Sequence, residues 1–357
     1  MVNLRFFGCV SGMALLAASV VSCSNDDPEG NIVPLPPVDG QGLFVVCEGG
    51  FGSGNASLAL YDVSSRQIHS NVFQDANGAL LGDVAQSMTI HNGKGWIVVN
   101  RSNVIFAIDP NTAKEVGRVT DGISSPRYLH FVSGQKAYVS QLAKNEIAVL
   151  DPESYTVTSS IPVPGYAENM AQIGDNLYVT CWSYGNKVVR INTESDNVDK
   201  EVEVGVQPKY IVADGNDRLW VITDGGWEGN PAGYEEPTLV CLDENLNILS
   251  KTGLPRASEY TSAGGLCINA AGDTLYWYNG SDIWSMSVDD IDSRKVLIEN
   301  ACQATYGLTV DPVNSQIYVA DAVDYSQQGM VYRFSADGKV LMDEFRVGIC
   351  PSSFCWK

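Results

Sequence analysis

The stretch from Gln135 to Pro164, QKAYVSQLAKNEIAVLDPESYTVTSSIPVP, contains one structural unit of this chain. Lys136–Ser140 and Glu146–Leu150 are typical of β-strands, because aromatic and β-branched residues alternate there with small or polar ones. A tight turn with proline at its second position follows at Asp151-Pro152, and Thr156–Ile161 forms a further strand. The pattern therefore predicts short antiparallel strands joined by tight turns.

An aromatic residue recurs seven times at the same place in such a run. The seven are Phe44, Trp96, Tyr138, Tyr178, Trp220, Tyr276 and Tyr318, at spacings of 52, 42, 40, 42, 56 and 42 residues. A repeat of about 40–45 residues with about four short strands is typical of a β-propeller blade. The sequence therefore predicts an all-β, seven-bladed β-propeller over residues 43–357, with these rings packed between neighbouring blades.

The C-terminus predicts how the ring of blades closes. Cys350-Pro351-Ser352-Ser353-Phe354 is similar to Ser125-Pro126-Arg127-Tyr128 and Gln207-Pro208-Lys209-Tyr210, which precede complete blades as innermost strands. No blade follows it, whereas Leu43–Phe73 lacks an innermost strand. We therefore expect the C-terminal strand to complete the N-terminal blade, which also removes exposed sheet edges.

The N-terminus is predicted to lie outside the propeller. Residues 1–22 have one positive charge followed by an apolar run that is short for a membrane span, which indicates a lipoprotein signal peptide. Cys23 follows a small residue, as in a lipobox, and would be the lipidated first residue; plain secretory cleavage is the alternative. Ser24-Asn25-Asp26-Asp27 resembles the surface-export signal of Bacteroidetes lipoproteins, and residues 23–42 form a Pro-rich tether. We expect an outer-membrane protein, lipid-anchored and facing the cell exterior.

Composition and motifs argue against several classes of function. With 22 Lys+Arg against 42 Asp+Glu, the chain has a net charge of −20, which disfavours nucleic acid and anionic lipid as partners. Neither a Gly-x-Ser-x-Gly elbow nor a His-Glu-x-x-His motif occurs, so we expect no catalysis. We also expect no bound cofactor and no metal, with a Ca²⁺ site at Asp321 and Asp324 as an open alternative. The cysteines are expected to be small buried residues rather than a disulfide framework.

Loops at one end of the propeller are the predicted binding surface. The loops between second and third strands at residues 48–57, 181–187, 223–238 and 321–330 are rich in aromatic, glycine and amide residues. Large rings normally belong to the core, so rings on loops indicate a ligand surface. The residues expected there are Phe51, Asn55, Arg101, Arg127, Trp182, Tyr184, Asn186, Trp227, Asn230, Tyr234, Tyr306, Asp324, Tyr325, Gln327 and Gln328.

The connections between blades are expected to face the central channel on the same side. They offer Gln86, Arg127, Glu168, Asn169, Lys209, Glu259, Tyr260, Thr305 and Tyr306. A mixed polar ring of this kind can hydrogen-bond a neutral ligand rich in amides or hydroxyls. The alternatives are that these residues are solvated channel lining and that the loop rings lie back on the blade tops.

Several motifs carry a closer resemblance. Tyr138-Val-Ser-Gln141 and Tyr178-Val-Thr-Cys181 resemble the repeat of the YVTN family of seven-bladed propellers. The chain is also similar to the BtuG-type cobalamin-binding surface lipoproteins of Bacteroides in Cys181-Trp-Ser-Tyr184, Thr223-Asp-Gly-Gly-Trp227-Glu-Gly229, Tyr306-Gly-Leu-Thr-Val310, Tyr318-Val-Ala-Asp-Ala322, Tyr325-Ser-Gln-Gln-Gly329 and Phe354-Cys-Trp-Lys357.

The resemblance implies a function. It implies capture of cobalamin or a related corrinoid outside the cell and delivery to a TonB-dependent transporter of the BtuB type. Two alternatives stay open: a surface propeller that binds a glycan or other ligand for another TonB-dependent uptake system, and a propeller lactonase, which would need a metal cluster at the channel mouth.

Overall fold

The computed structural model describes residues 35, 38, 40–258 and 262–357. The predicted signal peptide at residues 1–22, Cys23 and most of the predicted tether at residues 23–42 lie outside the described residues. The described part of the tether includes Leu35 and Val38, whose side chains pack against a buried cluster of the propeller. No helix within the described ranges is long and apolar enough to span a membrane.

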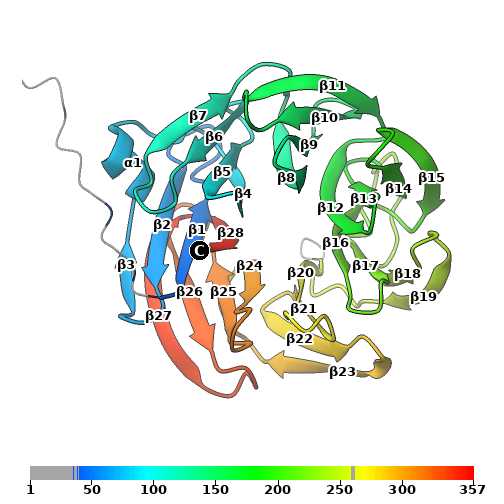
Figure 1. Ribbon diagram of the computed structural model, residues 1–357. Helices are drawn as coiled ribbons and strands as arrows, with labels where there is room; N and C mark the ends of the chain where they lie inside the picture. Colours follow the sequence, from blue (N-terminus) through cyan, green and yellow to red (C-terminus); the bar gives the residue numbers. More distant parts are fainter. Residues whose placement is uncertain (1–34, 36–37, 39, 259–261) are drawn as a thin grey trace, which may run out of the picture. The chain divides into compact units, whose positions relative to one another are not determined.

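The described residues form seven antiparallel sheets of four strands around a central axis, which confirms the predicted seven-bladed propeller (Figure 1). From the innermost strand outward, the first four sheets are β28 (Pro351–Trp356), β1 (Gly42–Cys47), β2 (Ser57–Asp62) and β3 (Gln67–His69); β4 (Ala85–His91), β5 (Lys94–Val99), β6 (Val104–Ile108) and β7 (Glu115–Val119); β8 (Pro126–Ser133), β9 (Lys136–Gln141), β10 (Glu146–Asp151) and β11 (Thr156–Pro162); and β12 (Ala167–Ile173), β13 (Asn176–Cys181), β14 (Lys187–Asn192) and β15 (Asn197–Glu203).

The remaining three sheets follow the same order. They are β16 (Pro208–Ala213), β17 (Leu219–Thr223), β18 (Thr238–Leu242) and β19 (Ile248–Gly253); β20 (Gly264–Ile268), β21 (Thr274–Asn279), β22 (Asp282–Ser287) and β23 (Asp290–Ile298); and β24 (Thr305–Val310), β25 (Ile317–Asp321), β26 (Gln328–Phe334) and β27 (Leu341–Ile349). The helix α1 (Val72–Asn77) lies in the connection from the first sheet to the second.

The predicted closure of the ring is confirmed. The C-terminal strand β28 pairs antiparallel with β1, with Leu43 opposite Trp356 and Val45 opposite Phe354. It occupies the innermost place in the first sheet, and each of the seven inner strands contacts the inner strands of both neighbouring sheets (Figure 1). The two ends of the described propeller are therefore held together by strand pairing.

The seven repeated aromatics pack between blades, as predicted. Each lies on the second strand of its sheet, and each belongs to a different buried cluster shared with one neighbouring sheet. Two of the tyrosines add a cross-blade hydrogen bond: Tyr178 Oη donates to the Glu244 carbonyl oxygen of the next sheet at 2.6 Å, and Tyr138 Oη donates to Asp196 Oδ1. A ring at this position thus joins two blades by apolar burial and, for Tyr138 and Tyr178, by a hydrogen bond.

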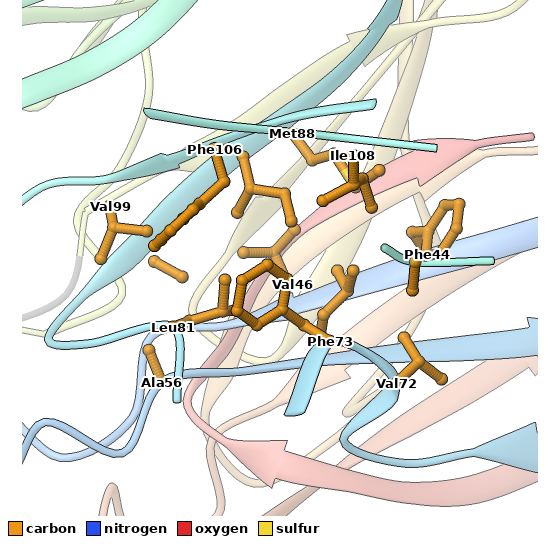
Figure 2. Close-up of a cluster of buried hydrophobic side chains, with 14 of the residues drawn as sticks. Phe44, Val46, Ala56, Val72, Phe73, Leu81, Met88, Val99, Phe106 and Ile108 are labelled. Atoms are coloured by element: carbon orange, nitrogen blue, oxygen red, sulfur yellow. The ribbon is translucent and has the colours of Figure 1, made fainter. Parts of the chain in front are cut away.

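Figure 2 shows the cluster between the first and second sheets. Phe44 and Val46 of β1, Phe73 of α1 and Phe106 of β6 all contribute side chains to this cluster. The rings of Phe73 and Phe106 have their centroids 4.9 Å apart. Part of the longer 52-residue interval therefore forms a helix that fills the core between two blades.

Candidate binding site

A β-bulge occurs near the start of every inner strand. In β16, Pro208 is opposite Thr223 and Tyr210 is opposite Ile222, so one residue, Lys209, is extra relative to β17. The other six inner strands show the same one-residue shift. A bulge releases a residue from the ladder and redirects its side chain. The second residues of the seven strands, which lie in these bulges, are Gln86, Arg127, Glu168, Lys209, Gly265, Tyr306 and Ser352.

The bulges surround a cavity of about 610 Å³ at one end of the central channel. Bulge residues line it together with Phe51, Trp182 and Tyr325 from loops between second and third strands. This confirms that the two kinds of connection meet on one face. The aromatic residues of the wall are Phe51, Tyr128, Trp182, Tyr210, Tyr278, Tyr306, Tyr325 and Phe354.

A buried ion pair fixes one side of this cavity. Arg127 Nε and Nη2 donate to the two carboxylate oxygens of Glu168, each at 2.7 Å, and Nη1 donates to Gln86 Oε1. Glu168 has no exposed surface. Burial lowers the pKa of Arg127, but the charge and hydrogen bonds of Glu168 outweigh it, so the pKa is raised and the guanidinium stays charged. Arg127 thereby joins three adjacent blades.

Tyrosine hydroxyl groups form much of the remaining polar wall. Tyr306 Oη donates to a carboxylate oxygen of Glu48 at 2.8 Å. Burial raises the pKa of Glu48, although the bond from Tyr306 and the charge of Arg127 oppose this shift. Burial also raises the pKa of Tyr128 and Tyr210, which keeps both phenols protonated. The wall therefore presents hydroxyl groups that can donate or accept hydrogen bonds.

A chain of hydrogen bonds orients the Trp182 ring. Its indole Nε1 donates to Asp224 Oδ2 at 2.7 Å, and the same carboxylate accepts Gln207 Nε2 at 2.9 Å. Gln207 Oε1 in turn accepts from Asn230 Nδ2 at 2.7 Å. Because the nitrogen edge of the indole is tied to Asp224, its ring remains available to the cavity.

Tyr278 fills the one position where the bulge residue has no side chain. Gly265 has φ +64°, and a Cβ there would lie 2.5 Å from the Tyr278 ring. A side chain at this bulge would displace the ring, since that distance is far inside van der Waals contact. Glycine therefore allows Tyr278, from the second strand of the sheet, to form part of the wall.

Comparisons with known proteins identify the family. Residues 41–345 match the model described as "Domain of unknown function (DUF5074)". The chain belongs to this family. A search of curated proteins finds no match.

Solved structures share the fold of this DUF5074 propeller. A quinonprotein alcohol dehydrogenase-like protein from Bacteroides thetaiotaomicron VPI-5482 is 16% identical, with TM-score 0.67 over 88% of this chain and 77% of that one. A proposed 6-phosphogluconolactonase from Bacteroides fragilis NCTC 9343 is 12% identical, with TM-score 0.67 over 90% and 99%. Virginiamycin B lyase from Staphylococcus aureus is 14% identical, with TM-score 0.58 over 75% and 87%. At these identities the similarity shows the fold alone.

Five of the residues predicted to bind ligand are brought together in the DUF5074 cavity: Phe51, Arg127, Trp182, Tyr306 and Tyr325. Among the predicted channel residues, Gln86, Asn169 and Lys209 also line it, whereas Glu168 lies behind Arg127. Thr305 is outside the lining, and Glu259 and Tyr260 lie outside the described residues.

The other predicted residues are placed away from the cavity wall. Arg101 pairs with Asp83 at 2.8 Å and lies over the Phe51 ring, 4.0 Å from its centroid. Tyr184 and Trp227 are about half exposed and meet edge to face, with centroids 5.8 Å apart. The further members outside the lining are Asn55, Asn186, Asn230, Tyr234, Asp324, Gln327 and Gln328.

Two of these loop residues stabilise their own loops. Asn55 Oδ1 accepts the Gly50 backbone N–H at 2.8 Å, and Asp324 Oδ2 accepts Gln327 Nε2 at 2.6 Å. Asp321, the other residue of the open Ca²⁺ alternative, accepts the Ala304 and Val323 backbone N–H groups. Within the described ranges, no group of three or more His, Cys, Asp or Glu side chains is placed to hold a metal ion.

Sequence reasoning missed several wall residues: Glu48, Tyr128, Tyr210, Tyr278 and Phe354. A signal existed for two of them, because Pro126-Arg127-Tyr128 and Pro208-Lys209-Tyr210 repeat the same order of proline, cation and tyrosine. This order places a tyrosine directly after a bulge residue. No comparable local signal marks Tyr278, because its place depends on the glycine bulge of a neighbouring strand.

Proposed function

We propose that this protein is a cell-surface lipoprotein that binds cobalamin and related corrinoids and delivers them to a TonB-dependent outer-membrane transporter of the BtuB type. The observation that carries the proposal is the aromatic cavity at the mouth of the propeller channel. Its volume of about 610 Å³ lies within the range of about 300–1,000 Å³ that is typical of ligand pockets.

The chemistry of the wall suits a corrinoid. A corrinoid is a wide, flat macrocycle with an apolar rim and many side-chain amides. The eight rings of the wall can cover its apolar edges, while Gln86, Asn100 and Asn169 can pair with its amides. The charge of Arg127 is matched by Glu168, and Lys209 lines the cavity with no carboxylate at bonding distance among the described residues. A wall of mostly neutral groups favours a ligand of low net charge.

Rigid placement of these groups supports tight binding. Every inner strand is held by its neighbours, and the ring is closed by β28, so little ordering is needed when ligand enters. Pre-organised sites gain affinity because they lose less conformational freedom on binding.

The ionisable groups support binding rather than catalysis. Burial raises the pKa of the Cys350 thiol to about 11, which leaves it protonated and a poor nucleophile near neutral pH. Arg127 is engaged by Glu168, and the wall tyrosines have raised pKa values. We therefore propose a carrier without enzymatic activity.

The membrane anchor and the transporter complete the proposal. Cys23, at the start of the mature chain, would carry the lipid, and the residues up to position 42 would join it to the propeller. The transporter is proposed for two reasons. The loop motifs resemble those of the BtuG-type proteins, and a corrinoid is too large to diffuse through ordinary porins, so it needs active transport.

Calorimetric titration with cyanocobalamin tests the proposal. The unchanged protein should bind it at micromolar ligand or below, and the purified complex should be red. Trp182→Ala should weaken binding by about 30-fold or more, as expected for a buried aromatic anchor. Trp227→Ala is the matched control, because this tryptophan lies on the same face but outside the cavity wall. No heat and no bound colour at micromolar cyanocobalamin would reject the proposal.

A glycan ligand is the second candidate, and one observation favours it. Tyr184, Trp227 and Tyr234 expose about half of their surface on neighbouring loops, and Arg256 lies over the Tyr234 ring, 4.6 Å from its centroid. Exposed rings of this kind can stack against sugar rings. A glycan array read with the unchanged protein and with Trp227→Ala distinguishes the candidates, because glycan binding should depend on Trp227 rather than on Trp182.

A further inference from the structure

Lys209 holds a positive charge inside the cavity. It is the bulge residue of β16 and lines the wall. Its Nζ lies 4.9 Å from the centroid of the Trp182 ring and 5.4 Å from that of Tyr210. Cation–π attraction to two rings keeps the ammonium against the aromatic wall. Lysine usually extends its charge into bulk water, so this inward position is unusual.

Two other described cations near this mouth already have carboxylate partners. The guanidinium of Arg127 is engaged by Glu168, and Arg101 pairs with Asp83. Both arginines were predicted ligand residues, but their carboxylate partners make them poor anion receptors. Lys209, in the part of the chain that the structure describes, has neither a carboxylate partner nor a hydrogen-bond acceptor at bonding distance.

An unpaired cation is notable in a protein with 42 acidic and 22 basic side chains. Acidic groups are abundant, yet none described pairs with Lys209. Its charge nevertheless acts across the cavity, where it is one of the influences that lower the pKa of Glu48 against burial. A cation held partly out of water without a counter-charge is unfavourable until an anion is supplied.

We propose that Lys209 binds an anionic group of the ligand. Resting on the corrinoid function proposed above, this group is the phosphodiester that links the corrin ring to its lower nucleotide. The ammonium would donate charge-assisted hydrogen bonds to the phosphate oxygens, and the rings of Trp182 and Tyr210 would cover the adjoining apolar part of the ligand. The site then distinguishes complete cobalamin from cobinamide, which lacks both phosphodiester and nucleotide.

Calorimetric titration of the full-length protein and of Lys209→Met with cyanocobalamin and with dicyanocobinamide tests this inference. Lys209→Met should weaken cyanocobalamin binding by about 10-fold to 100-fold, the range for a hydrogen bond to a charged group. Binding of dicyanocobinamide should change by about twofold or less. Lys209→Arg is the conservative control and should retain most of the preference for cyanocobalamin. Added salt should weaken cyanocobalamin binding more for the unchanged protein than for Lys209→Met.

The other outcomes are equally informative. If Lys209→Met weakens both corrinoids equally, or neither, the inference is wrong and Lys209 serves the cavity wall. If the unchanged protein binds neither corrinoid, the proposed function fails, and titration with inorganic phosphate decides the anion site. The NMR signal of the Lys209 side chain is assigned by its absence from the spectrum of Lys209→Met. As phosphate is added, this signal should move and reach a plateau when the site is saturated. A signal that does not move would overturn the anion site as well.

Discussion

Replacement of Tyr178 separates ring packing from hydrogen bonding at an interface between blades. Tyr178 has no exposed surface, and its ring lies in the cluster shared by the fourth and fifth sheets. Tyr178→Ala should cost about 3–5 kcal/mol of stability, as for other buried aromatics. Tyr178→Phe should cost only about 0.5 kcal/mol, because the Glu244 carbonyl that loses the hydroxyl still accepts Arg190 Nη1 at 3.2 Å.

Urea unfolding, followed by fluorescence and extrapolated to water, measures both costs. Tyr184→Ala is the control, since this tyrosine lies on the loop between β13 and β14 of the same blade and is half exposed. It should cost about 1 kcal/mol or less. If Tyr178→Ala costs no more than the control, the ring does not hold the two blades together. If Tyr178→Phe costs as much as Tyr178→Ala, the hydroxyl rather than the ring is responsible.

Three further predictions concern the closure and the charged groups. Removal of residues 351–357 opens the ring and exposes the edge of β1, so the truncated chain should aggregate on size-exclusion chromatography or melt at a much lower temperature; unchanged melting would contradict the closure. Glu168→Leu leaves Arg127 buried and unpaired and should cost about 3–5 kcal/mol in urea unfolding, most of which Arg127→Met should restore in the double variant. Burial raises the pKa of Glu48 above its ordinary value of 4.5, so the folded protein binds this proton more tightly than the unfolded chain does. The resulting stabilisation of the folded state is complete below pH 4.5 and is lost as pH rises through the pKa of Glu48 in the folded protein. Glu48→Gln should therefore become more stable relative to the unchanged protein as pH rises from about 4.5 towards neutrality, and a pH-independent difference in urea unfolding would refute this.

The fold could be predicted because each blade packs on its neighbours through the same few positions. A ring at Tyr138 or Tyr178 must lie on the second strand to reach the adjacent sheet, so the spacing of such rings reports the size of the blade. The closing strand was predictable for the same reason, since Pro351 begins an inner strand as Pro126 and Pro208 do. Only local sequence is needed for these inferences.

The direction of loop side chains could not be predicted in this way. Trp182 and Trp227 lie on loops of similar composition, yet Trp182 lines the cavity and Trp227 lies outside its wall. The difference depends on Asp224, which holds the Trp182 indole from the loop of the neighbouring sheet. The composition of a segment indicates that an aromatic ring lies on a loop. The orientation of that ring depends on a hydrogen-bond partner from another blade, which local sequence does not reveal.

The bulges explain why a regular repeat can form an irregular site. A bulged residue is released from strand pairing, so the fold requires a backbone shape at that position but no particular side chain. The side chains found there differ in charge, size and hydrogen-bonding capacity, from Arg127 and Glu168 to Tyr306 and Gly265. Where the bulge residue is glycine, the ring of Tyr278 occupies the space instead. Apart from the Arg127–Glu168 pair and Gly265, which also support the packing of the blades, substitutions at cavity-lining bulge residues such as Lys209 should change what the cavity binds with little change to the interfaces between blades.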